Sequence, residues 1–106
     1  MKEEYFKYFL EDKGLTQRAI SDYISRCRRI ENKKSGLGVN LDNEYARDKG
    51  KSLLNLLTYT RGDQNLNIKP PIIFQKNSDI YNGMRSIKSA ATSYFKFCSE
   101  SISETK

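Results

Sequence analysis

The sequence contains no histidine, and among its 106 residues there are only two cysteines and two prolines. Histidine is the usual general base near neutral pH and a frequent zinc ligand. Its absence excludes Ser-His-Asp and Cys-His catalytic arrangements and argues against a zinc site. The phosphate-cradling loops GxxxxGKS/T and GxGxxG are missing as well. These absences predict a chain that is not an enzyme and that uses no metal and no cofactor.

The two cysteines and the short apolar runs indicate the cellular compartment in which the protein resides. Cys27 and Cys98 stand at positions expected to face inward on helices, and their spacing matches no metal site. Free thiols in a reducing compartment account for both. No apolar run approaches the roughly 18 residues that span a membrane, and residues 1–14 carry acidic side chains within their apolar part, unlike a signal peptide. We therefore expect a cytoplasmic protein with no membrane partner.

Aromatic and basic residues are abundant by contrast. Seven tyrosines and five phenylalanines supply apolar burial for one compact domain, residues 1–106. Lysine and arginine total 19 against 13 acidic residues, a net charge of +6, and residues 14–40 hold six positive and two negative charges. Such a segment suits a polyanion, because neutralised phosphates release condensed counterions. The alternative is a solvated basic face with no partner.

Apolar residues recur at helical spacing in four segments, which predicts an all-α fold. We expect a compact four-helix bundle with helices at about 3–13, 17–34, 43–60 and 79–101. The expected N-caps of the last three helices are Thr16, Asp42 and Ser78. The third helix is expected to bury Ala46, Gly50, Leu53, Leu54 and Leu57. Residues 61–77 lack a helical period and contain a double proline, which predicts a long loop.

The second predicted helix has a basic face opposite its apolar face. Projected at 100° per residue, the apolar side centres on Ile20 and Cys27, while Arg18 and Arg29 lie almost opposite. Arginine side chains contact phosphates or guanine edges, so this face suits DNA. The last predicted helix repeats the arrangement less strongly, with one polar face formed by Arg85, Ser89, Thr92 and Lys96.

Two stretches of the sequence resemble a known family. LTQRAISDYISR at residues 15–26 resembles the opening of the core-binding domain of tyrosine recombinases, the phage integrase family. GMRSIKSAATSYFKFC at residues 83–98 resembles the last helix of that domain. The order and spacing of the four expected helices agree, so the resemblance covers essentially the whole chain. It implies a SAM-like helical bundle that grips one side of duplex DNA while a separate catalytic domain closes on the other.

Candidate contacts to double-stranded DNA follow from these patterns. Carried over by position, the resemblance favours Thr16, Arg18, Ser21, Arg26, Arg85, Lys88, Ser89 and Thr92. The basic face of the second helix adds Arg29 and Lys33. The resemblance also implies association with the nucleoid, and a catalytic domain or another protomer as a further partner.

The chain departs from the family in one respect. The catalytic arginine, His-x-x-Arg motif and tyrosine nucleophile of these recombinases belong to a downstream domain that this sequence lacks. No tyrosine is therefore assigned a catalytic role, and Tyr23 and Tyr94 are expected in the core. Two alternatives stay open, a fragment of a recombinase and a free-standing relative that only binds.

A helical protein-interaction module is the competing interpretation. Tyr5, Phe6, Tyr8 and Phe9 cannot all share one narrow buried face, so part of this aromatic surface is expected to be exposed. A third interpretation is a nucleic-acid decoy or anti-repressor from a mobile element. DNA binding predicts a steep dependence on salt, whereas a protein interface depends on salt less.

Overall fold

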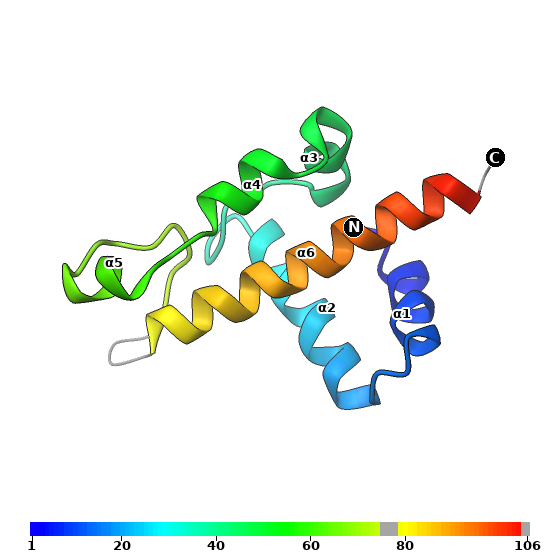
Figure 1. The fold of residues 1–106 in the computed structure, drawn as a ribbon, viewed down its shortest axis with the longest axis horizontal. Helices are drawn as coiled ribbons and strands as arrows, with labels where there is room; N and C mark the ends of the chain where they lie inside the picture. Colours follow the sequence, from blue (N-terminus) through cyan, green and yellow to red (C-terminus); the bar gives the residue numbers. More distant parts are fainter. Residues whose placement is uncertain (75–78, 105–106) are drawn as a thin grey trace.

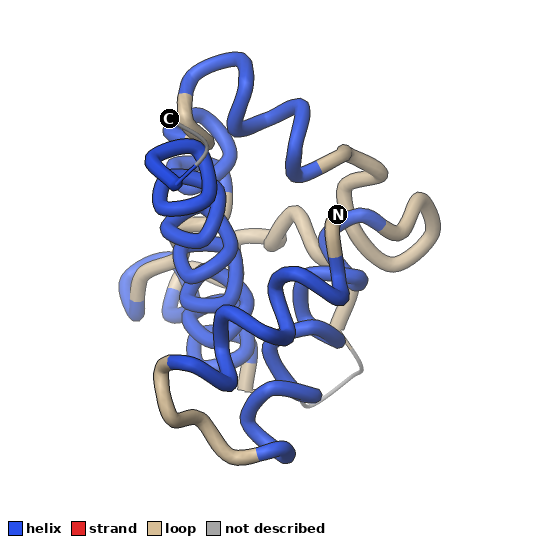
Figure 2. Tube along the Cα trace, turned by 90° about the vertical axis from the view of Figure 1, so that its right-hand side faces the viewer, coloured by secondary structure: helices blue, strands red, loops and turns tan. Residues whose placement is uncertain are grey.

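The computed structural model describes residues 1–74 and 79–104, and this part of the chain forms helices and no strand (Figures 1 and 2). The helices are α1 (Glu3–Asp12), α2 (Gln17–Glu31), α3 (Leu41–Asp48), α4 (Lys51–Leu56), α5 (Arg61–Asn65) and α6 (Ile80–Glu104). The predicted all-α class is confirmed. The predicted count of four helices is wrong, because the third expected helix is divided and the expected loop contains a short helix.

The long helix α6 is the element against which the others pack. In Figure 1 it runs diagonally, with α1 and α2 below it, α3 and α4 above it, and α5 near its N-terminal end. Its inward face is fully or almost fully buried and consists of Met84, Ile87, Ala90, Ala91, Tyr94, Phe95 and Phe97. The other helices add buried side chains to the same core, chiefly Phe6, Leu10, Ile20, Cys27, Ile30, Leu41, Leu53 and Leu57.

Small side chains lie where α2 crosses α6. Ala90 is 0% exposed, and the Cys27 thiol donates a hydrogen bond to the Ala90 carbonyl at 3.6 Å. Burial is the main cause that raises the pKa of this thiol to about 12, so it is protonated at neutral pH. Cys27 and Cys98 are both free, as predicted. The crossing therefore brings the two helix backbones close together without a covalent link.

One of the predicted helix caps is confirmed, and another is wrong. The Thr16 hydroxyl accepts a hydrogen bond from the Ala19 amide at 3.2 Å, as predicted for the start of α2. The start of α3 is capped by Asn40 instead of Asp42. The predicted cap Ser78 lies outside the described residues, and the Asp79 carboxylate accepts from the Asn82 amide at 3.2 Å.

The predicted third helix is interrupted at Lys49 and Gly50. Both residues have positive φ, 60° and 80°, so the chain turns between α3 and α4. A Cβ on Gly50 would lie 2.2 Å from the ring of Phe95, which shows how closely this turn packs on α6. The turn also changes which side chains face inward: Leu53 and Leu57 are buried as predicted, whereas Ala46 is exposed.

Local hydrogen bonds account for the remaining differences. Helix α2 ends at Glu31, before the predicted end at 34, because the Asn32 side chain accepts from the amides of Lys34 and Ser35 and turns the chain. Helix α5 occupies the start of the expected loop, where Thr60 and Asp63 form a capping box. Helix α6 extends beyond the predicted end at 101, to Glu104.

A charged network joins the N-terminus to three helices. The Met1 ammonium lies 3.2 Å from Glu31 and 3.4 Å from Asp42, and the Met1 side chain is 2% exposed. Glu31 also accepts from the Leu41 amide, while the Tyr94 hydroxyl donates to Asp42 and accepts from the Lys2 amide at 2.9 Å. Burial lowers the pKa of the Met1 amine, but the hydrogen bond and charge of Glu31, with those of Asp42, outweigh it and raise the pKa overall.

The raised pKa of the Met1 amine predicts a pH-dependent stability. The protonated amine stabilises the fold fully below its ordinary value of 8.0, and this contribution is lost as pH rises from there through the raised folded value. We expect the free energy of unfolding from urea titrations to fall in this range. The matched control is the same chain acetylated at Met1, which should be less stable and should lack this part of the pH dependence. An identical pH dependence in both chains would contradict the prediction.

Candidate nucleic-acid interface

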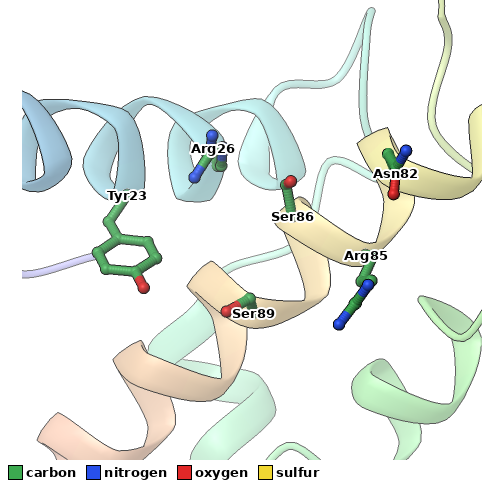
Figure 3. Close-up of a pocket in the computed structure, with 6 residues that line it drawn as sticks. All are labelled: Tyr23, Arg26, Asn82, Arg85, Ser86 and Ser89. Atoms are coloured by element: carbon green, nitrogen blue, oxygen red, sulfur yellow. The ribbon is translucent and has the colours of Figure 1, made fainter. Parts of the chain in front are cut away.

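Three of the predicted DNA contacts, Arg26, Arg85 and Ser89, meet in one pocket between α2 and α6. The pocket has a volume of about 260 Å³ and is shown in Figure 3. Its lining consists of Tyr23, Arg26, Asn82, Arg85, Ser86 and Ser89. No carboxylate belongs to this lining, and every lining side chain carries a hydrogen-bond donor.

Helical spacing explains why these side chains gather here. On α2, Tyr23 and Arg26 lie three residues apart, beside the buried face formed by Cys27 and its neighbours. On α6, the residues at 82, 85, 86 and 89 recur at intervals of three and four, so they lie on one side of the helix, and all four line the pocket. Each helix therefore presents polar groups at the edge of the same buried crossing.

The two arginines make the pocket suited to an oxyanion. Among the described residues, neither Arg26 nor Arg85 takes part in an ion pair or a hydrogen bond. Arg26 is half-buried and Arg85 is exposed. Guanidinium groups bind phosphate oxygens through charge-assisted hydrogen bonds, and the neighbouring serine hydroxyls supply further donors. The lining of this pocket thus combines guanidinium and hydroxyl donors, both of which bind phosphate oxygens.

Tyr23 was expected in the core and is instead half-buried at the pocket. Figure 3 shows its ring leaving α2, with the hydroxyl directed to the α6 side of the pocket. Tyr94, the other tyrosine expected in the core, is 0% exposed, as predicted. Asn82 and Ser86 also line the pocket and were not among the predicted contacts. Asn82 lies three residues before Arg85 and Ser86 lies three residues before Ser89, and this helical spacing is the sequence signal that identifies them.

The other predicted contacts on the N-terminal half of the chain lie outside this pocket. Arg18, Ser21 and Lys33 are exposed, the last of them beyond the end of α2. Neither Arg18 nor Lys33 forms an ion pair within residues 1–74 and 79–104. The Thr16 hydroxyl is engaged in capping α2. Arg18 and Lys33 are therefore exposed cations outside the pocket, and the exposed Asp22 lies between Arg18 and Arg26 on α2.

Arg29, a predicted DNA contact, holds a loop in place. Its guanidinium donates to the Ile73 carbonyl and lies 4.6 Å from the centre of the Phe74 ring. A Cβ on Gly83 would lie 2.4 Å from Phe74, so this ring packs directly on the backbone of α6. Arg29 thus connects α2 to the segment before α6, and its side chain is already committed to protein partners.

Two predicted contacts on α6 are also engaged within the protein. The Lys88 ammonium donates to the Thr58 hydroxyl at 2.7 Å, which directs this side chain toward the end of α4 and away from α2. The Thr92 hydroxyl donates to the Lys88 carbonyl at 2.8 Å and remains exposed. The structure therefore does not bring Lys88 or Thr92 into the pocket.

In the part of the chain that the structure describes, no three side chains of the types that bind metals lie close enough to share an ion. No described helix combines the length and the apolar character needed to cross a membrane. Burial is the main cause that raises the pKa of the Cys98 thiol to about 11.

Comparison with protein-family models, with characterised proteins and with solved structures finds no match to this chain. The resemblance to recombinase core-binding domains therefore stays a prediction from the residues quoted above.

The contacts of Arg29 predict a structural role that Arg18 does not share. We expect Arg29→Ala to lower the free energy of unfolding by about 1–2 kcal/mol, through loss of the hydrogen bond and the cation–π contact. Arg18→Ala removes the same charge from the exposed side of α2 and should change stability by less than about 0.5 kcal/mol. Urea titrations of both variants measure this, and equal effects would contradict the assigned role of Arg29.

Proposed function

We propose that this chain is a non-catalytic domain that binds double-stranded DNA, with one backbone phosphate in the pocket between α2 and α6. The observation that carries the proposal is the meeting of Arg26 and Arg85, from helices far apart in the sequence, with no carboxylate in the pocket lining. Phosphate contacts supply most of the affinity in non-specific DNA binding.

The surroundings of the pocket support a polyanion as the ligand. Arg18 and Lys33 are exposed on or just beyond α2, and Lys96 is exposed on α6, eleven residues after Arg85 and so on the same side of that helix. These cations are available to further phosphates of the same DNA molecule. The net charge of +6 acts in the same direction by steering the chain to DNA.

The role that fits best is that of the core-binding domain of a tyrosine recombinase. In such proteins a helical bundle of this kind positions DNA, and chemistry belongs to another domain. On this proposal the chain contributes grip and orientation, associates with the nucleoid, and cooperates with a catalytic domain or another protomer.

Replacing both pocket arginines tests the proposal. We expect Arg26→Ala with Arg85→Ala to weaken binding to a fluorescent duplex of about 30 base pairs at least about tenfold, because two charge-assisted phosphate contacts are lost. Fluorescence anisotropy at several salt concentrations gives the affinity. Wild-type binding should weaken log-linearly with salt.

The matched control is Lys7→Ala with Lys51→Ala, which removes the same charge from exposed positions on α1 and α4. It should weaken binding by about threefold or less, since distant exposed charges are screened. Equal losses of DNA affinity in the two double variants would show that net charge, and not the pocket, determines binding. Absence of wild-type binding at low salt would refute the DNA proposal itself.

A protein partner for α1 is the second candidate, and one observation favours it. Tyr5 and Tyr8 lie three residues apart on α1 and are 67% and 58% exposed, while Phe6 is buried. Exposed aromatic pairs of this kind are frequent at protein interfaces. Such a partner would bind with little dependence on salt, and the two functions can coexist because α1 does not line the arginine pocket.

A further inference from the structure

A second pocket lies beside α5, apart from the arginine pocket. Its volume is about 640 Å³, within the range of small-molecule sites. Its lining includes Tyr59, Gln64, Asn65, Asn67, Lys69 and Pro70. Figure 1 shows α5 and the chain that follows it beside the N-terminal end of α6.

The walls of this pocket are held in place by contacts from several directions. Thr60 and Asp63 form the capping box of α5. The Arg61 guanidinium lies 4.4 Å from the centre of the Tyr81 ring, and the Gln64 side chain accepts from the Tyr81 amide at 2.9 Å. These contacts join α5 to α6, so the pocket is formed before any ligand binds.

The returning chain on the other side of the pocket is fixed as well. The Tyr59 hydroxyl donates to the Ile68 carbonyl at 2.6 Å, and the Ile68 amide donates to the Asp63 carbonyl at 2.9 Å. Asn67 has a φ of 56°, a backbone conformation that asparagine tolerates better than most residues. The turn at 66–68 therefore has a defined shape.

The polar groups of the pocket are mainly side-chain amides. Asn65 and Asn67 form no side-chain hydrogen bond with any described residue, and the amide nitrogen of Gln64 is free beside its occupied oxygen. Each amide offers a donor and an acceptor side by side, the pattern that recognises the edge of a nucleobase. Pro70 and Tyr59 supply apolar surface for a planar ring.

The charged side chains at this pocket restrict the class of ligand further. Lys69 is exposed and has no ion pair in the described part of the chain. No carboxylate belongs to the lining of this pocket. The nearby Asp63 carboxylate accepts a hydrogen bond within the capping box of α5. The pocket therefore disfavours amines and cations and favours a ligand that carries both hydrogen-bonding edges and an anionic group.

We infer that this pocket binds one unpaired nucleotide, with the base held by the amides of Asn65 and Asn67 and the phosphate held by Lys69. The nucleotide can be free in solution or part of a single strand, because both present the same base and phosphate. This site is separate from the duplex-binding pocket, and the inference does not depend on duplex binding.

Nuclear magnetic resonance titration of the ¹⁵N-labelled chain with the four deoxynucleoside 5′-monophosphates tests the inference. We expect at least one of them to cause saturable shifts of the amide signals of residues 64–70 and of the Asn65 side chain. Deoxyribose 5-phosphate, which lacks the base, should not. A hexanucleotide that binds more tightly than the monophosphate would assign the pocket to single strands, and equal or weaker binding would assign it to free nucleotides.

Variants separate this site from other anion binding. Asn65→Ala should weaken nucleotide binding at least about fivefold, whereas Asn43→Ala, an exposed asparagine on α3, should leave it unchanged. The double variant Arg26→Ala with Arg85→Ala should retain the shifts even though it loses duplex binding. Unchanged binding by Asn65→Ala, equal shifts from deoxyribose 5-phosphate, or shifts confined to the arginine pocket would overturn the inference.

Discussion

The close crossing of α2 and α6 is the constraint on which the rest of this structure depends. Ala90 presents only a methyl group at the contact, and the Cys27 thiol bonds to the α6 backbone there. A larger residue at 90 would separate the helices, because protein cores have little free volume. The separation would also part Arg26 from Arg85, so the packing of apolar atoms determines the geometry of the charged pocket.

The basic residues of α2 and α6 that were predicted to bind DNA divide into those with and those without partners in the protein. Arg26 and Arg85 lie at the edge of the crossing with no partner among the described residues, where a ligand can reach them. Arg29 and Lys88 lie on the flanks and hold neighbouring segments through Ile73 and Thr58. A basic face seen in a sequence thus combines cations available to a ligand with cations that support the fold.

Local sequence signals predicted the elements that local interactions determine. The Thr16 cap and the apolar spacing located α2 and α6, because those features act within a few residues. The turn at Gly50 depends on the Phe95 ring. Asp42 lies inside α3, where it binds the Met1 ammonium and the Tyr94 hydroxyl, and Asn40 is the cap. Such contacts between distant residues leave no periodic pattern in one sequence.

The candidate site was predictable in part for the same reason. Helical projection placed Arg26 and the Arg85–Ser89 face outward on their own helices, which is a local property. It could not show that the two faces meet, because the crossing angle depends on packing across the core. Arg29 was assigned to DNA on the same basis, although the Phe74 ring lies against its guanidinium.

The most direct test of the account follows the arginine side chains themselves during DNA binding. Arginine Nε–Hε signals of the ¹⁵N-labelled chain should be recorded while a duplex of about 12 base pairs is added. We predict that the signals of Arg26 and Arg85 shift together along one isotherm, while that of Arg29 stays nearly unchanged. Shifts of Arg29 equal to those of the pocket arginines, or independent isotherms for Arg26 and Arg85, would contradict a single phosphate site at the crossing of α2 and α6.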